Sequence, residues 1–380
     1  MNIVVPKEDA AGERRVALVP ESCKKLIGKG LEVVVQQGAG EQAFFADEQY
    51  RSVGASVAGD GGAALAAADL VLMVQPPTAA QVEAMRPGAM LLTSLLPIRN
   101  LATVKHLAKR RITAFSTDCI PRTTRAQSMD TLSSMANIAG YKAVLIAASE
   151  LAKYFPMFMT AAGTIHAAKA FVIGAGVAGL QAIATARRLG ATVTATDTRK
   201  AVAEQIHSLG AKFVGVDSAE DAQTATGYAK ELSPEFYRKQ AELIAQQCAA
   251  SDVVITTALI GGVKAPRLIT AEMVRKMQPG SVIVDLAAEG GGNCELTRPG
   301  ETVVENGVKI IGPLNLPASM PRDASTLYSR NLTTFVLEFY KDGRFNLDLQ
   351  DEIIAGALVT HDGDVRHTAS REALQKEGHA

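Results

Sequence analysis

Neither sign of charge is in excess in this sequence, because 39 lysine and arginine residues balance 39 aspartate and glutamate residues. No basic block stands out, so no nucleic-acid partner is expected. Cysteine is scarce, and no C-x-x-C pair occurs. We interpret the four widely separated cysteines as reduced thiols, not as disulfides or metal ligands. They are Cys23, Cys119, Cys248 and Cys294.

Long apolar runs are also missing. No stretch reaches the roughly 20 apolar residues of a transmembrane helix, and the opening residues lead straight into a predicted strand without a signal peptide. The six histidines show no metal-ligand spacing, and neither a G-x-S-x-G nor a P-loop motif is present. We therefore predict a cytoplasmic protein with no metal site, which reaches a membrane only through a partner.

Short apolar segments alternate with helical segments along most of the chain, which is 47% hydrophobic. This alternation is typical of βαβ units and a parallel sheet. Strands are predicted at 2–5, 31–36, 70–74, 90–95 and 112–115, and then at 169–173, 192–196, 212–216, 252–257, 281–286 and 309–311. Helices are predicted at 20–29, 100–110, 177–189, 200–209, 234–249 and 270–277.

Two longer helical stretches separate these groups of strands. One follows a polar loop within 130–155, and the other covers 323–340. Because the second stretch follows the last strand, we expect the chain to return to its first domain. The predicted fold class is α/β, with two Rossmann-like doubly wound parallel-sheet domains and a ligand-binding cleft between them. The first domain comprises 1–136 with 317–380, the second 137–316, and the polar end 361–380 is predicted to be loosely ordered.

A glycine fingerprint is the most informative motif. Residues 171–179 read Phe-Val-Ile-Gly-Ala-Gly-Val-Ala-Gly, so a buried strand runs into Gly174-x-Gly176-x-x-Gly179 at the start of a helix. The first glycine permits a tight turn and the second lets a pyrophosphate approach the backbone. The third lets the helix pack on its strand. The diphosphate then lies on the helix N-terminus, and the sequence predicts a dinucleotide site.

Asp197, at the end of the next predicted strand, indicates which dinucleotide binds. A carboxylate at this place hydrogen-bonds a free ribose 2′-hydroxyl and repels a 2′-phosphate, which favours NAD(H) over NADP(H). Arg199 instead favours NADP(H), because a nearby arginine can hold the 2′-phosphate. The alternative is that Asp197 only caps the following helix.

Three further segments follow predicted strands. The loop 121–133 offers a cation, an amide, a carboxylate and a hydroxyl, a mixed set that suits a nicotinamide carboxamide, although Asp130 or Ser133 could simply cap the next helix. The polar stretch 217–233 is either a lid or a solvated loop. The glycine run within 287–294 indicates close approach of the backbone to a ligand or a neighbouring segment. We interpret its Glu289 as a polar loop residue in preference to an acid or base.

Together these motifs resemble one family over essentially the whole chain: the NAD(H)-binding alpha-1 subunits of bacterial proton-translocating nicotinamide nucleotide transhydrogenases, which are related to alanine dehydrogenases. The resemblance includes Gly12-Glu-x-Arg-Val16, Thr160-Ala-Ala-Gly-Thr164, Gly227-Tyr-Ala-Lys-Glu231 and Gly291-Gly-Asn-Cys294. Its most specific part is the run Arg-Ala-Gln-Ser-Met-Asp at 125–130.

The resemblance implies which residues contact NAD(H). The nicotinamide and its ribose are held, and hydride transfer is supported, by Arg122, Gln127, Asp130 and Ser133, with Thr123 and Thr124 in the same loop. The remaining cofactor contacts are Gly174, Gly176, Val177, Gly179, Asp197, Thr198, Arg199, Gly227, Tyr228, Gln240 and Leu259. No metal is implied.

The resemblance also implies partners. NADP(H) is bound by a beta subunit, the proton pathway lies on membrane-embedded alpha-2 and beta subunits, and this chain is a homodimer on the cytoplasmic face of the inner membrane. Two alternatives stay open: an NAD-dependent alanine-type amino acid dehydrogenase, and a non-catalytic NAD(H)-sensing module. Related alanine dehydrogenases use a lysine and a histidine in the first domain, but the matching segments, around Met73 and Gln75 and at 93–97, contain neither residue.

Overall fold

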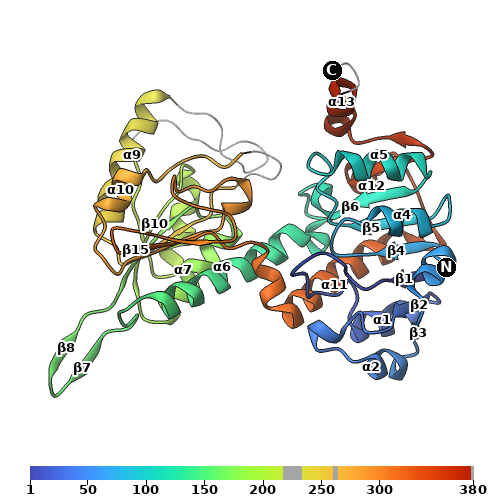
Figure 1. Ribbon diagram of the computed structural model, residues 1–380, viewed down its shortest axis with the longest axis horizontal. Coiled ribbons are helices and arrows are strands. Elements are labelled where there is room, and N and C mark those ends of the chain that lie inside the picture. Colours follow the sequence, from blue (N-terminus) through green and yellow to red (C-terminus); the bar gives the residue numbers. More distant parts are fainter. Residues whose placement is uncertain (217–232, 260–263, 378–380) are drawn as a thin grey trace. The chain divides into compact units, whose positions relative to one another are not determined.

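The computed structural model describes residues 1–216, 233–259 and 264–377 (Figure 1). The chain divides into two compact units. Unit 1 comprises Met1–Met135 and Pro317–Ala380, and unit 2 comprises Ala136–Leu316. Helix α6 (Thr131–Glu150) begins in unit 1 and ends in unit 2.

The main sheet of unit 1 is parallel except at one edge. Its strands are β1 (Asn2–Val5), β2 (Glu32–Gln36), β3 (Ser56–Ala58), β4 (Leu70–Leu72), β5 (Met90–Thr93), β6 (Thr113–Ser116), β18 (Leu358–His361) and β19 (Asp364–Val365). They lie in the order β19-β18-β6-β5-β4-β1-β2-β3. The strands from β3 to β6 pair in parallel, and β18 and β19 are added antiparallel beside β6.

Helices bury both faces of this sheet. They are α1 (Pro20–Ile27), α2 (Asp47–Ser52), α3 (Gly61–Ala66), α4 (Ala79–Ala84), α5 (Leu101–Lys109), α11 (Pro321–Phe339), α12 (Glu352–Ala357) and α13 (Thr368–Glu377). Alternate strand residues enter different cores: Ile3 and Val5 join the core that contains α1 and α11, whereas Val4 joins the core that contains α4 and α5. Burial on both faces explains why these strands are continuous apolar runs.

Unit 2 repeats the scheme. Its main sheet contains β9 (Lys169–Ile173), β10 (Thr192–Thr196), β11 (Lys212–Phe213), β12 (Val253–Thr256), β13 (Val282–Asp285), β14 (Thr302–Glu305) and β15 (Val308–Ile311). Their order is β11-β10-β9-β12-β13-β15-β14, and only β14 is antiparallel. The main helices are α6, α7 (Val177–Arg188), α8 (Ala203–Ser208), α9 (Pro234–Ala249) and α10 (Ala271–Arg275).

The parallel strands of both units follow the spatial order 3-2-1-4-5-6 when they are numbered along the chain within each unit. This is the order of dinucleotide-binding doubly wound sheets, in which ligands bind beyond the carboxyl ends of the strands where the order reverses. The reversal lies between β1 and β4 in unit 1, and between β9 and β12 in unit 2. The predicted α/β class with two Rossmann-like domains is confirmed.

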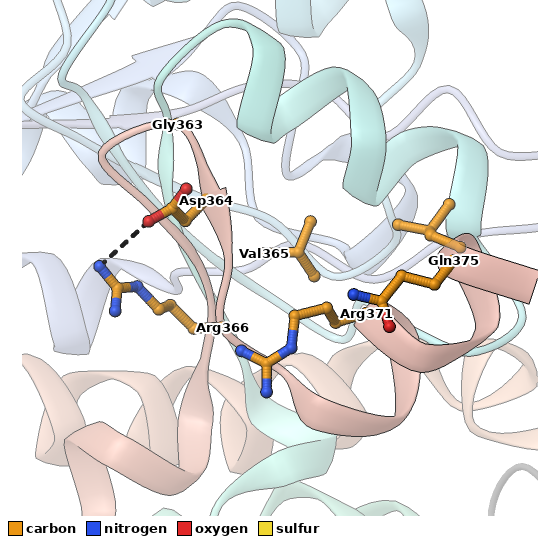
Figure 2. A pocket seen from close by; sticks show the side chains of 7 residues that line it. Gly363, Asp364, Val365, Arg366, Arg371 and Gln375 are labelled. Atoms are coloured by element: carbon orange, nitrogen blue, oxygen red, sulfur yellow. Dashed lines mark ion pairs between the residues drawn. The ribbon is translucent and has the colours of Figure 1, made fainter. Parts of the chain in front are cut away.

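The prediction of a loosely ordered end was wrong. After β18 the chain turns at Asp362 and Gly363, which both have positive φ, and continues as β19 and α13. Val365 and Leu374 pack against a core of unit 1. Figure 2 shows both strands of the hairpin with Arg371 and Gln375 on α13 beside a shallow hollow. The polar composition misled the prediction because this edge is anchored by only a few apolar side chains.

Three further hairpins were not predicted, one of which is β14–β15 at the edge of the unit 2 sheet. β16 (Tyr340–Lys341) and β17 (Arg344–Phe345) form a small hairpin in unit 1. In unit 2, β7 (Phe158–Thr160) and β8 (Gly163–Ile165) form a hairpin that projects away from the rest of that unit (Figure 1). All six of its strand residues are exposed.

Candidate functional site

The three glycines of the fingerprint have three different environments at the end of β9. Gly174 has a φ of 97°, and a Cβ there would lie 2.4 Å from Thr257 Oγ1. A Cβ on Gly179 would lie 1.9 Å from the Gly174 carbonyl oxygen, so a side chain is impossible without moving the backbone. A Cβ on Gly176 would meet nothing within 4 Å. The space beside the N-terminus of α7 is therefore open at the position where a pyrophosphate would approach.

Asp197 follows β10 and joins this turn. Its Oδ2 accepts a hydrogen bond of 2.8 Å from the Ala175 amide, within the glycine turn. The Arg199 guanidinium donates to both carboxylate oxygens, from Nε to Oδ1 and from Nη2 to Oδ2, each at 2.9 Å. Burial by itself raises the pKa of Asp197, but the hydrogen bonds from Arg199 and Ala175 outweigh burial and hold the pKa below its usual value. Asp197 is thus an anion that is fixed beside the turn.

The capping alternative does not describe Asp197, because the N-cap of the following 3₁₀ helix (Lys200–Val202) is Arg199, without a side-chain cap. Beyond the carboxylate lies a hollow of about 340 Å³. The described residues that line it are Asp197, Thr198, Lys200, Ala203, Phe213, Gly215, Val216 and Phe236. An aromatic ring can stack on an adenine base and a carboxylate can accept from ribose hydroxyls, so this lining is compatible with an adenosine.

The predicted nicotinamide loop lies in unit 1, between β6 and α6. Ala126 and Met129 are buried and anchor the loop in a core of unit 1, whereas Arg122 and Gln127 are exposed. Thr124 is exposed as well, and Thr123 is half-buried with a hydroxyl that has no hydrogen-bond partner among the described residues. The loop is therefore fixed from beneath and presents polar groups outward.

Asp130 and Ser133 contact each other directly. Asp130 Oδ1 accepts from the Ser133 amide at 2.8 Å, and Asp130 Oδ2 accepts from the Ser133 hydroxyl at 2.6 Å. Asp130 therefore does cap α6, as one interpretation of the sequence proposed. Capping the helix and contacting a nicotinamide are compatible, because a carboxylate that is held rigidly by its own helix is also a well-oriented acceptor.

Two side chains to which the sequence analysis assigned no role each hold a loop in place. Asn331 on α11 donates from Nδ2 to the carbonyl of Ser128 at 2.8 Å. Asn293, fully buried in the glycine run after β13, accepts from the Ala258 amide and donates to the carbonyls of Ala258 and Pro266. No local signal identifies either residue, since each acts on a segment that is distant in sequence.

The other predicted contacts are scattered in their exposure. Leu259 is exposed just after β12, and Gln240 is buried on α9. Gly227 and Tyr228, with most of the 217–233 stretch, lie outside the described residues. Glu289 accepts from the Asn315 amide, which is a loop contact as expected. The glycine run itself is organised by the fully buried Asp285 carboxylate, whose contacts are the Ala287 and Cys294 amides and the Thr256 and Thr297 hydroxyls.

Comparison with known proteins identifies the family. The model for the alanine dehydrogenase/PNT N-terminal domain matches residues 4–139, and the model for the C-terminal domain matches residues 143–368. The chain belongs to the alanine dehydrogenase/PNT family. The resemblance stated from the motifs is confirmed, and it places the glycine turn and Asp197 in an NAD(H)-binding family.

Individual relatives agree with this assignment. The chain is 50% identical over 378 residues to a protein of Rhodospirillum rubrum named as an NAD(P) transhydrogenase subunit alpha, covering 97% of this chain and 98% of that protein. A solved transhydrogenase from Sinorhizobium meliloti superposes with a TM-score of 0.89 at 45% identity, covering 96% of this chain and all of that one. A solved L-alanine dehydrogenase gives 0.84 at 25% identity, covering 99% of both chains. No helix among the described residues is long and apolar enough to cross a membrane.

Unit 1 carries a largely buried cluster of charged and polar side chains where its strand order reverses. Arg15 donates to both oxygens of Glu13, at 2.7 and 2.6 Å, and Gln75 Nε2 donates to Glu13 Oε2 at 2.7 Å. Burial raises the pKa of Glu8 to about 8. Both oxygens of Glu8 nevertheless accept from the Val74 and Gln75 amides. No lysine or histidine belongs to this cluster among the described residues.

Substitutions at two glycines should separate folding from nucleotide binding. Gly179→Ala should lower the free energy of unfolding by about 1–3 kcal/mol, because its methyl group would overlap the Gly174 carbonyl. Gly176→Ala should change stability by less than about 0.5 kcal/mol and weaken NADH binding by roughly tenfold or more, because its methyl group would occupy open space. Urea unfolding and NADH fluorescence titration measure the two effects, and the chain has no tryptophan to interfere. Equal destabilisation in both variants would contradict this assignment.

Glu13 should make unit 1 sensitive to acid. Burial by itself raises the pKa of Glu13, but hydrogen bonds from Arg15 and Gln75 outweigh burial and lower the pKa from 4.5 to about 2. Because the folded pKa is depressed, the stabilisation is complete above about pH 4.5 and is lost as the pH falls through about 2. Glu13→Gln should cost about 3 kcal/mol at pH 7 and progressively less below pH 4.5. Urea unfolding of the wild type and of Glu13→Gln from pH 7 to pH 3 measures the difference in the free energy of unfolding. A difference that stayed constant with pH would contradict this prediction.

Proposed function

We propose that this chain is the NAD(H)-binding subunit of a proton-translocating transhydrogenase. Hydride passes directly between C4 of the nicotinamide held here and C4 of the NADP(H) nicotinamide held on a partner subunit. The curated relatives named as transhydrogenase alpha subunits support this proposal. So does the fixed Asp197 carboxylate beside the glycine turn, because it favours a free ribose 2′-hydroxyl.

The charge cluster of unit 1 is the observation that favours a second nucleotide over a keto acid as the hydride acceptor. An amino acid dehydrogenase needs a group that exchanges a proton with the keto acid. Here Met73 is buried and Gln75 is committed to Glu13, and Arg15 cannot serve as a general acid because it stays protonated. Glu8 is the one group of this cluster with a pKa near neutrality, and its oxygens are occupied by two amides. Transfer between nucleotides needs no such proton donor.

Positioning is the remaining contribution of the protein. Arg122, Gln127, Asp130 and Ser133 orient the nicotinamide and its ribose, with Thr123 and Thr124 in the same loop. The bound NAD(H) supplies the hydride chemistry, and the protein holds the reacting carbon in line with its acceptor. Correct orientation can contribute several kcal/mol to lowering the barrier. The cap bonds between Asp130 and Ser133 support this role, because both groups are fixed before a nucleotide arrives.

Further subunits complete the enzyme. A beta subunit carries the NADP(H)-binding domain, and membrane-embedded alpha-2 and beta subunits carry the proton pathway. This chain is peripheral on the cytoplasmic face of the inner membrane and attaches through those partners. Coupling to proton movement acts through nucleotide binding, since NADH and NADPH have nearly equal intrinsic potentials.

The chain is also proposed to form a homodimer, in which a second copy covers the β7–β8 hairpin. Isolated two-stranded hairpins are marginally stable in water. Apolar side chains are exposed on this hairpin and on the segment just before it: Phe158, Met159 and Ile165 on the strands, and Tyr154 and Met157 ahead of them. Symmetric dimers are the commonest oligomers, and a projecting apolar hairpin suits a self-complementary interface.

Hydride transfer to an NAD⁺ analogue from NADPH tests the main proposal, with a purified NADP(H)-binding domain of a beta subunit present or absent. Turnover is expected only when the partner domain is present. Asp130→Asn and Arg122→Ala should each lower the rate by roughly tenfold or more, because the nicotinamide loses a fixed contact. Arg330→Ala is the matched control, since that exposed arginine pairs with Glu21 outside the loop. Full activity in both loop variants would contradict the assignment of this loop to nicotinamide binding.

A parallel reaction with NADH, pyruvate and ammonium distinguishes the alternatives. Turnover there would identify an amino acid dehydrogenase. No turnover in either reaction, combined with tight NADH binding, would favour the sensing module.

Self-association should depend on the hairpin. Met159 is 80% exposed, and Met159→Asp should shift the dimer toward monomer by at least tenfold in Kd, because a charge would be buried at the interface. Val304→Asp is the matched control, an apolar residue exposed on β14. Sedimentation velocity over a concentration series measures both variants. An unchanged dimer in Met159→Asp would place the interface elsewhere.

A further inference from the structure

Arg199 is bound to the residue that selects the nucleotide. Its Nε and Nη2 atoms each donate to a different oxygen of Asp197, and its own amide donates to Oδ1 as well. The Asp197 side chain is 8% exposed and the Arg199 side chain 20%. A paired fork of this kind, largely removed from water, holds the guanidinium in one orientation.

We propose that Arg199 is a latent receptor for a 2′-phosphate, and that Asp197 determines specificity partly by keeping this receptor occupied. The inference rests on the proposed function, because it takes the hollow beside Asp197 as the adenosine site of NAD(H). Asp197 then acts twice. Its charge repels a 2′-phosphate directly, and its two oxygens engage the guanidinium donors that would otherwise bind that phosphate.

The chemistry of the two anions supports this interpretation. A planar guanidinium binds carboxylates and phosphates through the same pair of parallel N–H donors. Arg199 is also next in sequence to Lys200, which lines the hollow together with Asp197. Among the described residues that line the hollow, Asp197 is the only acidic one. Without the Asp197 carboxylate, the one charged side chain left among these lining residues would be Lys200, with Arg199 as its neighbour in sequence.

A purely structural role for Arg199 predicts something different. If the arginine served only to orient Asp197, loss of the Asp197 charge would weaken NADH binding and would create no affinity for NADPH. If the charge of Asp197 alone excluded the phosphate, its loss would improve NADPH binding whether or not Arg199 was present. The proposal requires that the gain depend on Arg199.

The experiment measures NADH and NADPH dissociation constants by fluorescence titration of the full chain. The proteins are the wild type, Asp197→Asn, Arg199→Ala and the double variant. Asparagine keeps an oxygen that can accept from the Ala175 amide, so the turn retains its hydrogen bond. Asp197→Ser serves as a second variant if Asp197→Asn does not fold. Glu305→Gln is the matched control, because it removes a carboxylate that pairs with Arg275 elsewhere in unit 2.

Asp197→Asn should bind NADPH at least tenfold more tightly than the wild type and NADH several-fold more weakly. The double variant should lose the gain for NADPH, and Arg199→Ala alone should not acquire it. The Glu305→Gln control should leave both constants unchanged. No gain in Asp197→Asn or Asp197→Ser, or an equal gain in the double variant, would overturn the proposal.

This outcome is separable from the fate of the proposed function. Nucleotide binding is measured on this chain alone, whereas hydride transfer needs the partner domain. A wild type that binds NADH but supports no transfer would contradict the transhydrogenase activity and leave the specificity test intact. A wild type that does not bind NADH would overturn both.

Discussion

Unit 2 depends on one close approach of backbone to backbone. Helix α7 leaves β9 so tightly that a Cβ on Gly179 would lie 1.9 Å from the Gly174 carbonyl oxygen. The start of α7 is equally close to α6, where a Cβ on Gly140 would lie 2.1 Å from the Ala178 carbonyl oxygen. These contacts fix the N-terminus of α7 at the carboxyl end of β9. The adjoining turn offers the Ala175 amide to Asp197, so the packing constraint also builds the polar site.

Local sequence was sufficient wherever burial on both faces made a strand uniformly apolar. The bounds predicted for β1, β9, β10 and α9 agree with the structure, and the other predicted parallel strands differ only at their ends. The short and partly exposed parallel strand β3 was not predicted. The β14–β15, β16–β17 and β18–β19 hairpins were missed although each carries a turn signal, whereas the missed β7–β8 hairpin turns at two alanines. Asn306-Gly307, Asp342-Gly343 and Asp362-Gly363 all have positive φ at both residues. The strands β14, β16, β17 and β19 are too short or too exposed to show an apolar pattern, so only the turn residues could have revealed these hairpins.

Within the candidate site too, features formed by residues close in sequence were predictable, and features formed by distant residues were not. The glycine turn, Asp197 and the Asp130–Ser133 pair are formed by residues close in sequence, so their spacing was informative. Asn331 and Asn293 each hold a loop that lies far away along the chain, and an isolated asparagine gives no signal of that role. The pairing of Arg199 with Asp197 was only partly predictable from the sequence. The sequence placed the two residues together, but only the structure shows that the arginine is committed to the carboxylate.

The two units show why topology alone does not determine what binds. Both have the same strand order, and both reverse it between their first and fourth strands. In unit 2 the reversal point follows a glycine turn with open space beside Gly176. In unit 1 it is filled by Glu8, Glu13 and Arg15, whose hydrogen bonds connect the loops after β1 and β4. A pyrophosphate approaches bare backbone amides at this place. In unit 1 the Val74 and Gln75 amides already donate to Glu8. The same strand order therefore carries an open glycine turn in unit 2 and a hydrogen-bonded polar cluster in unit 1.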